Sequence, residues 1–399
     1  MNKTVAIGEV EKARATAVPI LVGLSLSHML NDMNQSLLSA IYPTVKASMG
    51  LSFAEIGLVT FAYQAVASLL QPFVGLATDK KPHPHSLSVA MLATMCGLLL
   101  LSVANRYEVL IGAAMLVGVG SSIFHPESSR IARLASGGRH GLAQSLFQVG
   151  GNAGSALGPL LAAFIVGARG QGSIGWFAIG PFLASMALWK IGSWAQAQGL
   201  AAKKRPAGAE NDLTRRQKWT AMAVLLALIF SKYIYLASLQ SYYTFYLIQT
   251  FGLSVKNAQL CLFLFLGAVA VGTVAGGPIG DRFGRKYVIW FSILGVLPFT
   301  LALPWVGLVP TLLLSIVIGL VLSSAFSAIV VFGQELMPHR VGAVAGLFFG
   351  LAFGVGGLGA AGLGWVADLK GIDFVYRVCS VLPAFGLLAA LLPDMKKRV

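Results

Sequence analysis

The sequence is poor in charge, and its few charges are mostly of one sign. Only 11% of the 399 residues are Asp, Glu, Lys or Arg, whereas 56% are hydrophobic, and soluble domains carry about 25% charged residues. The net charge of +15 does not indicate nucleic-acid binding, because the basic residues lie in short breaks between apolar runs and form no continuous basic face. With a mean hydropathy of +0.78, this composition predicts a membrane protein embedded in a lipid bilayer.

Cysteine is also scarce. Cys96, Cys261 and Cys379 each lie inside an apolar run, so they do not indicate a disulfide framework or a zinc site. The sequence has no nucleotide-binding loop, no metal-ligand cluster and no nucleophile–base pair above chance. We therefore expect a protein that is not an enzyme and that has no metal and no cofactor.

Apolar runs of membrane-spanning length are abundant. They lie at about 18–45, 53–77, 87–104, 108–130, 142–167, 174–195, 219–249, 257–280, 287–304, 309–334, 342–367 and 374–392. These twelve runs predict an all-α membrane protein of twelve transmembrane helices in two pseudo-symmetric six-helix bundles. The predicted parts are an N-terminal segment (1–17), two bundles (18–195 and 219–392), a linker (196–218) and a tail (393–399).

Lysine and arginine predict the orientation. They concentrate in both termini, in the linker and in the loops after every second run, which places these parts in the cytoplasm. The first run lacks an A-x-A cleavage pattern, so we expect it to be retained as a helix. Only Lys232 lies deep inside a run, the seventh.

The first run carries a polar stripe. His28, Asn31, Asp32 and Gln35 fall on one side of a helix at spacings of three and four residues. A carboxylate near the centre of a membrane helix costs about 2.5 to 3.5 kcal/mol on insertion scales. The stripe therefore faces a protein interior or a watered cavity. His28 is either a hydrogen-bonded core histidine or a group that titrates near neutral pH.

Further polar groups lie in the fourth, fifth and seventh runs. Lys232 occupies a place in the second half that matches, within one helical turn, that of Asp32 in the first. The two either form a static ion pair or line a pathway for substrate and protons. The candidate substrate-binding residues are His28, Asn31, Asp32, Gln35, His125, Arg130, Gln148, Lys232, Tyr235 and Tyr243, and the candidate proton-coupling residues are Asp32, Glu127, His28 and His125. Tyr235 and Tyr243 are as consistent with packing as with binding, and Glu127 with a solvated helix end.

Two similar stretches close the second and eighth runs. The segment from Gly75 to Asp79 and Lys80 has the same glycine-to-aspartate spacing as the segment from Gly277 to Asp281 and Arg282, 202 residues later. A repeat at the same junction of both halves indicates a parallel internal repeat. We expect a charged cytoplasmic gate formed by Asp79, Lys80, Asp281, Arg282, Arg285 and Lys286; the alternative is an ordinary basic loop.

These motifs resemble those of the major facilitator superfamily. Residues 277–286 meet its G-x-L-a-D-r-x-G-r-k loop signature nearly in full, whereas the first copy departs from it after Lys81. Gly154, Gly158 and Pro159 resemble the G-x-x-x-G-P packing signature of its antiporters, although the doubled glycine expected after the proline is missing. The resemblance implies two halves that give alternating access to a site between them.

The segments 25–43, 120–130, 136–144 and 231–246 are similar to a branch of that superfamily that exports phosphonate antibiotics. This similarity implies a monomeric exporter of a small anionic molecule in the bacterial inner membrane, with protons as the coupling ion. A proton-coupled importer of a small anionic metabolite would have the same fold and is the alternative. A membrane sensor would be expected to carry a longer cytoplasmic domain than the linker or the tail provides.

Overall fold

The computed structural model describes residues 16–40, 45, 48–51, 53–203 and 213–395. The predicted N-terminal segment, the middle of the linker and the end of the tail therefore lie largely outside the described residues. Within the described ranges all regular structure is helical. This agrees with the all-α fold class that the sequence predicts.

The first half consists of α2 (Val18–Ala40), α4 (Phe53–Lys80), α5 (Ser86–Ser102), α6 (Tyr107–Ala135), α7 (His140–Leu161), α8 (Gly167–Arg169) and α9 (Ile179–Lys203). A π-helical segment (Ala162–Val166) follows α7, and a 3-10 helix (Gln171–Ala178) precedes α9. The second half consists of α10 (Arg215–Phe251), α11 (Val255–Phe283), α12 (Arg285–Leu294), α13 (Leu297–Ala302), α14 (Leu308–Leu336), α15 (Val341–Lys370) and α16 (Ile372–Cys379). Short 3-10 helices follow α13 (Leu303–Trp305) and α16 (Leu382–Leu391).

Each of the twelve predicted apolar runs coincides with a helix or with a broken series of helices. Among the described residues, nine helical spans are long and apolar enough to cross a membrane. The ninth run is divided into α12, α13 and a 3-10 turn, with prolines in the first turns of the last two, because proline cannot donate the backbone hydrogen bond of a continuous helix. α10 begins earlier than predicted, where Thr214 and Gln217 form a capping box.

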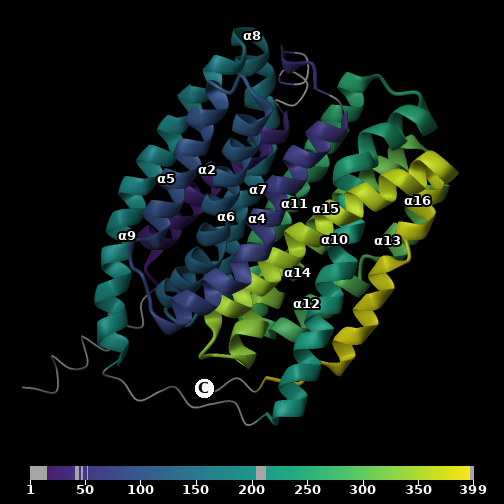
Figure 1. Ribbon diagram of the computed structural model, residues 1–399. Coiled ribbons are helices and arrows are strands. Elements are labelled where there is room, and N and C mark those ends of the chain that lie inside the picture. Colours follow the sequence, from purple (N-terminus) through teal and green to yellow (C-terminus); the bar gives the residue numbers. More distant parts are fainter. Residues whose placement is uncertain (1–15, 41–44, 46–47, 52, 204–212, 396–399) are drawn as a thin grey trace, which may run out of the picture.

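The two halves lie side by side (Figure 1). The interface between them is formed mainly by α4 against α15 and α7 against α11, and these two pairs are equivalent under the internal repeat. We call the end where α9 ends and α10 begins the linker end. Large apolar side chains such as Phe61, Phe73, Phe164 and Leu358 are exposed on the outer faces, as expected of a multi-pass membrane protein whose surface is covered by lipid.

Glycines allow the interface helices to approach closely at the linker end. A Cβ atom on Gly75 of α4 would overlap the backbone carbonyl of Gly342 on α15. In the equivalent pair, a Cβ atom on Gly277 of α11 would overlap the backbone of Gly141 on α7. Small residues let helix backbones pack in contact in this way, and the contact brings the two repeated aspartates to the first turn of the facing helices.

Candidate functional site

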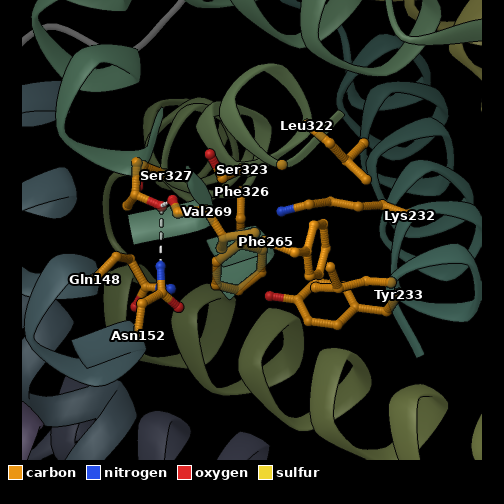
Figure 2. A pocket seen from close by; sticks show the side chains of 13 residues that line it. Gln148, Asn152, Lys232, Tyr233, Phe265, Val269, Leu322, Ser323, Phe326 and Ser327 are labelled. Carbon is orange, nitrogen blue, oxygen red and sulfur yellow. Dashed lines mark hydrogen bonds between the residues drawn. The ribbon is translucent and has the colours of Figure 1, made fainter. Parts of the chain in front are cut away.

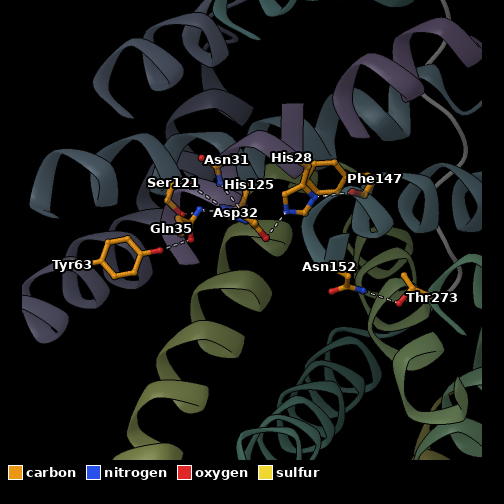
Figure 3. A network of polar contacts seen from close by, with 10 residues as sticks. All are labelled: His28, Asn31, Asp32, Gln35, Tyr63, Ser121, His125, Phe147, Asn152 and Thr273. Carbon is orange, nitrogen blue, oxygen red and sulfur yellow. Dashed lines mark hydrogen bonds and ion pairs between the residues drawn. The ribbon is translucent and has the colours of Figure 1, made fainter. Parts of the chain in front are cut away.

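A cluster of three titratable side chains lies on the first-half side of the interface. α2 places His28 and Asp32 one turn apart, and α6 brings His125 to the same carboxylate. His28 Nε2 lies 3.2 Å from one carboxylate oxygen of Asp32, and His125 Nε2 lies 3.4 Å from the other. All three residues are buried, and Figure 3 shows them converging between helices.

The other ring nitrogen of each histidine fixes its tautomer. His28 Nδ1 lies 2.7 Å from the carbonyl oxygen of Phe147, and His125 Nδ1 lies 2.9 Å from that of Ser121. Because a carbonyl only accepts, both Nδ1 atoms carry a hydrogen. Each Nε2 therefore faces Asp32 either as a donor in the charged imidazolium or as an acceptor from a protonated carboxyl. The cluster thus has places for up to two protons and can change its charge without moving a helix.

Neutral polar groups complete the surroundings of Asp32. Asn31 Nδ2 and Gln35 Nε2 donate to Asp32 Oδ1 at 3.0 and 3.2 Å, and the Tyr63 hydroxyl donates to Gln35 Oε1. Asp32 also lines a cavity of about 210 Å³, together with Gln35, Ser36, Leu38, Thr60, Tyr63, Gln64, Ser155 and Phe353. Most of these residues lie farther from the linker end along their helices than Asp32 does, so the cavity extends from the carboxylate away from that end.

The same trio could hold a metal ion by donor type. Two imidazole nitrogens and a carboxylate oxygen, all within 4.8 Å of one another, resemble donor sets that bind divalent metals. The sequence alone predicts no metal-ligand cluster, because the three residues come from two helices, α2 and α6, that lie far apart in the sequence. Proton sharing accounts for the observed contacts, and we treat the trio as a proton-sharing cluster.

Lys232 lies across the interface, near the middle of α10. Its side chain is buried, and none of the described residues forms an ion pair or a hydrogen bond with its ammonium group. The nearest compensation comes from the rings of Tyr233 and Phe326, whose centroids are 5.1 and 5.3 Å from Nζ. Lys232 lines a partly enclosed cavity of about 30 Å³ that Gln148 and Asn152 of α7 also line, so both halves contribute to it (Figure 2).

The aromatic contacts compensate the lysine only in part. A cation–π contact contributes about 0.5 to 2 kcal/mol, whereas removing an ion from water costs several kcal/mol even after relaxation. The static Asp32–Lys232 ion pair, one of the two alternatives from the sequence, is not formed, because the Asp32 carboxylate contacts His28 and His125 instead. The charged form of Lys232 therefore lacks an anionic partner among the described residues.

The polar group at the end of α6 forms a separate site. Glu127 is fully buried and accepts from Arg130 Nε at 2.9 Å, with a second contact to the guanidinium. Arg130 also lines a basic cavity of about 570 Å³ at the linker end, together with Arg133, Leu134, Ser136, Gly137, Gly138, His140 and Val341. α6 thus carries His125 to the Asp32 cluster, but it pairs Glu127 with Arg130 instead of bringing either of them to that cluster.

The predicted tyrosines lie in the core of the second half. Tyr243 is fully buried and donates to Ser315 Oγ at 2.9 Å, and Tyr235 is also buried; neither lines the cavity at Lys232. The rings that contact the ammonium, Tyr233 and Phe326, are missing from the sequence prediction. Tyr233 is the immediate neighbour of Lys232 in sequence, which is a weak signal, whereas the approach of Phe326 depends on the packing of α14 against α10.

The repeated aspartates hold the two halves together at the linker end. Asp79 of α4 accepts from the backbone N–H groups of Gly342 and Ala343 at 2.9 and 2.8 Å. Asp281 of α11 accepts from those of Gly141 and Leu142, both at 2.9 Å. Each carboxylate thus caps the first turn of a helix in the opposite half, where the helix dipole favours a negative charge.

The basic residues next to these aspartates behave differently from one another. Arg285 pairs with both Asp281 and Glu335, at 3.0 and 3.1 Å, and Lys286 pairs with Asp394 at 3.1 Å. Lys80 and Arg282 are exposed. A further bridge between the halves runs from Gln334 Nε2 to Ser129 Oγ at 3.0 Å. Together with the two carboxylate caps, this bridge joins the two halves at the linker end.

The glycine motif of α7 lies against α2. A Cβ atom on Gly154 would overlap the carbonyl oxygen of Met29, and one on Gly158 would come within 2.7 Å of that of Met33. The side chain of Pro159 lies outside the described part of the chain. The close contact between α7 and α2 brings Phe147 to His28, with their rings stacked at 4.1 Å.

Comparison with known proteins identifies the family. The family model described as Major Facilitator Superfamily matches residues 24–361. The chain belongs to the major facilitator superfamily. It is 56% identical to the fosmidomycin resistance protein of Escherichia coli (strain K12), over 98% of this chain and 97% of that protein. It is 40% identical to the uncharacterized MFS-type transporter YfnC of Bacillus subtilis (strain 168), over 97% of this chain and 96% of that protein.

Solved structures of the superfamily share the fold. The Escherichia coli fucose:proton symporter FucP aligns over 96% of this chain and 100% of its own with a TM-score of 0.71 at 13% identity. The human organic anion transporter MFSD10 aligns over 95% of this chain and 100% of its own with a TM-score of 0.74 at 16% identity. These matches, together with the family model, make the chain a membrane transporter with the two-bundle architecture that the sequence predicts.

Proposed function

We propose that this transporter exports anionic phosphonate antibiotics of the fosmidomycin type in exchange for protons, by alternating access. The observation that carries the proposal is Lys232, a buried cation at the interface of the two halves with no anionic partner among the described residues. The similarity to the fosmidomycin resistance protein over nearly the whole chain supports a phosphonate as the anion.

Lys232 supplies the charge that recognises the phosphonate. An ammonium group binds a phosphonate oxygen as a point charge, and the amides of Gln148 and Asn152 add neutral polar contacts from the other half. The cavity of about 30 Å³ is far smaller than the roughly 300 to 1,000 Å³ of drug-sized pockets. Substrate entry therefore requires the halves to separate around Lys232, and the contacts at the linker end must open when the substrate arrives from that side.

The His28–Asp32–His125 cluster carries the coupling protons. It lies in the half opposite Lys232, and its carboxylate residue, Asp32, lines the cavity of about 210 Å³ described above. With the linker end in the cytoplasm, as the distribution of basic residues predicts, this cavity receives protons from outside. Protonation reduces the negative charge on the pathway or adds positive charge to it, which favours the return of the carrier after the drug has left.

The exchange is driven by the membrane potential as well as by the pH gradient. Outward movement of one negative charge and inward movement of one proton each gain about 2.3 kcal/mol per 100 mV of inside-negative potential. A monomer in the bacterial inner membrane suffices for this cycle, since both halves of the site belong to one chain. A proton-coupled importer would have the same fold but would need the opposite dependence on the proton gradient.

Drug transport in proteoliposomes under an imposed pH gradient tests the direction of transport. Vesicles with reconstituted protein are loaded with fosmidomycin, and an acidic or an alkaline external buffer is imposed. We expect the acidic exterior to accelerate drug loss from vesicles whose protein has its linker end facing the lumen, because protons enter as the drug leaves. Acceleration of drug uptake by an acidic exterior would instead favour the importer, and no response to either gradient would refute proton coupling.

A further inference from the structure

The cavity at Lys232 combines a buried ammonium group with a volume of about 30 Å³, which is small for a phosphonate. None of the 13 described residues that line it is acidic. Lys232 is nevertheless buried in it, with its ammonium group directed into the space that α7 and α14 border (Figure 2). A partner of opposite sign stabilises a buried ammonium group, and the described residues that line the cavity supply none.

Two other polar groups of the cavity lack partners. The hydroxyl of Ser327 on α14 is buried without a hydrogen bond, and so is Oε1 of Gln148 on α7. Turning the Gln148 amide by 180° exchanges its oxygen and nitrogen, so this group can present N–H as readily as C=O. By contrast, Asn152 is satisfied by a 2.9 Å bond to Thr273 Oγ1. An ammonium, a hydroxyl and an amide that can donate thus line the same cavity.

The size of the cavity restricts what these donors hold. A volume of about 30 Å³ accommodates one or two species of the size of water and is a poor fit for phosphate, phosphonates and organic acids. Water fits but leaves the positive charge uncompensated, whereas a halide fits and neutralises it. We propose that one chloride ion binds Lys232, Ser327 and Gln148 when the substrate is absent.

The chloride site deepens the proposed function and rests on it, since it uses the ammonium group assigned to the phosphonate. Chloride and drug then compete for one cation. The empty carrier changes conformation with its lysine neutralised, and the arriving drug exchanges one anion for another instead of meeting a bare charge. Drug affinity should accordingly fall as the chloride concentration rises at constant ionic strength.

Thermal unfolding of the purified protein in nanodiscs of neutral lipid tests the site. Sodium chloride or sodium bromide is titrated against sodium gluconate at constant ionic strength. Because a ligand that binds only the folded state stabilises it by an amount that grows with the logarithm of its concentration, we expect the Tm to rise steadily with halide, by about 2 °C or more over the titration. Lys232→Met should abolish the rise. Lys190→Met, which removes an exposed lysine from the membrane helix α9, should retain it. An equal rise in the Lys232→Met protein, or no rise in the wild type, would overturn the chloride site.

Two further measurements keep the test decisive if Lys232→Met does not fold. Ser327→Ala removes one proposed ligand of the ion and should weaken halide binding severalfold; unchanged halide binding would count against the site. Anomalous scattering from bromide should place the ion beside Lys232 Nζ, and a peak elsewhere would also count against the site. Fosmidomycin binding in chloride and in gluconate separates this inference from the proposed function. Binding that needs Lys232 but is equal in both salts would refute the chloride site alone, and binding that does not need Lys232 would refute both.

Discussion

The two buried charges at the centre of the molecule occupy equivalent helices of the repeat, yet their surroundings differ. Asp32 on α2 is contacted by His28, His125 and two amides, whereas the ammonium of Lys232 on α10 lies near two aromatic rings and pairs with no acidic group among the described residues. The carboxylate is thus compensated from within its own half. The lysine has no such partner among the described residues and depends on something that enters the cavity. The difference supports the proposal that the first half exchanges protons and the second half binds the anion.

Replacing Lys232 should have the largest effect. Among the described residues that line the cavity, Lys232 is the one cation. Lys232→Gln removes it, and a hydrogen bond to a charged group contributes about 1.5 to 3 kcal/mol. We expect fosmidomycin transport to fall by a factor of about 10 to 100, measured in proteoliposomes at matched protein content. Lys190→Gln on the lipid-facing side of α9 is the matched control and should transport at the wild-type rate. Full activity of Lys232→Gln would show that the second half does not bind the anion through this residue.

Asp32→Asn should separate binding from coupling. Asparagine keeps a hydrogen-bonding side chain of the same shape but cannot bind a proton, so an imposed pH gradient should no longer drive transport. Drug binding at fixed pH should stay within about threefold of the wild type, because the proposed anion-binding group is Lys232 and not Asp32. A threefold change corresponds to less than about 1 kcal/mol of binding free energy. The measurement is drug binding to the purified protein beside transport with and without the gradient. Gradient-driven transport that survives in Asp32→Asn would move the coupling site elsewhere, with the buried Glu127 as the next group to replace.

The two aspartate caps at the linker end allow a finer comparison. Both accept two backbone N–H groups, but Asp281 is also linked to Glu335 through Arg285. Asp281→Asn should therefore open the linker end more than Asp79→Asn does. In a cysteine-free background, a cysteine in place of the buried Ser145 on α7 should react faster with a membrane-impermeant maleimide in both variants. A larger acceleration in Asp79→Asn would reverse the order of the two caps.

Tyr243→Phe should have the smallest effect. The Tyr243 hydroxyl bonds to Ser315 in the core and does not line the cavity at Lys232, so transport should stay within about twofold of the wild type. Loss of this bond should lower the unfolding free energy by about 1 kcal/mol, which a lower Tm would report. A large loss of transport with an unchanged Tm would place the hydroxyl in the substrate pathway.

The fold follows closely from the sequence because membrane insertion is dictated by long apolar runs and by the placement of Lys and Arg. Each predicted run coincides with helical structure, and the glycine-to-aspartate repeat lies where two helix ends from opposite halves meet. The break of the ninth run follows from its prolines.

The two repeat loops also differ for a local reason: Gly284 has a φ of 102°, which Pro82 at the matching position of the first loop cannot adopt.

The site follows from the sequence only in part. The helical spacing places His28 beside Asp32, but the approach of His125 depends on how α6 packs against α2, which no spacing encodes. The repeat correctly relates Lys232 to Asp32 as opposite charges in matching helices, yet it does not determine whether they touch. That outcome depends on which side chains pack within contact distance of Asp32, and in the structure these are His28 and His125. Tyr233 and Phe326 escape prediction because aromatic residues in membrane helices most often pack against neighbours or lipid.

The central claim is that Lys232 binds an anion supplied from outside the protein. A comparison of two ligands that differ in charge tests this claim most directly. Binding of fosmidomycin and of its uncharged phosphonate diester is measured by calorimetry for the wild type and for Lys232→Met. We expect the wild type to prefer the anion by at least tenfold and Lys232→Met to bind both ligands with similar affinity. A preference for the anion that is equal in the two proteins would contradict the account.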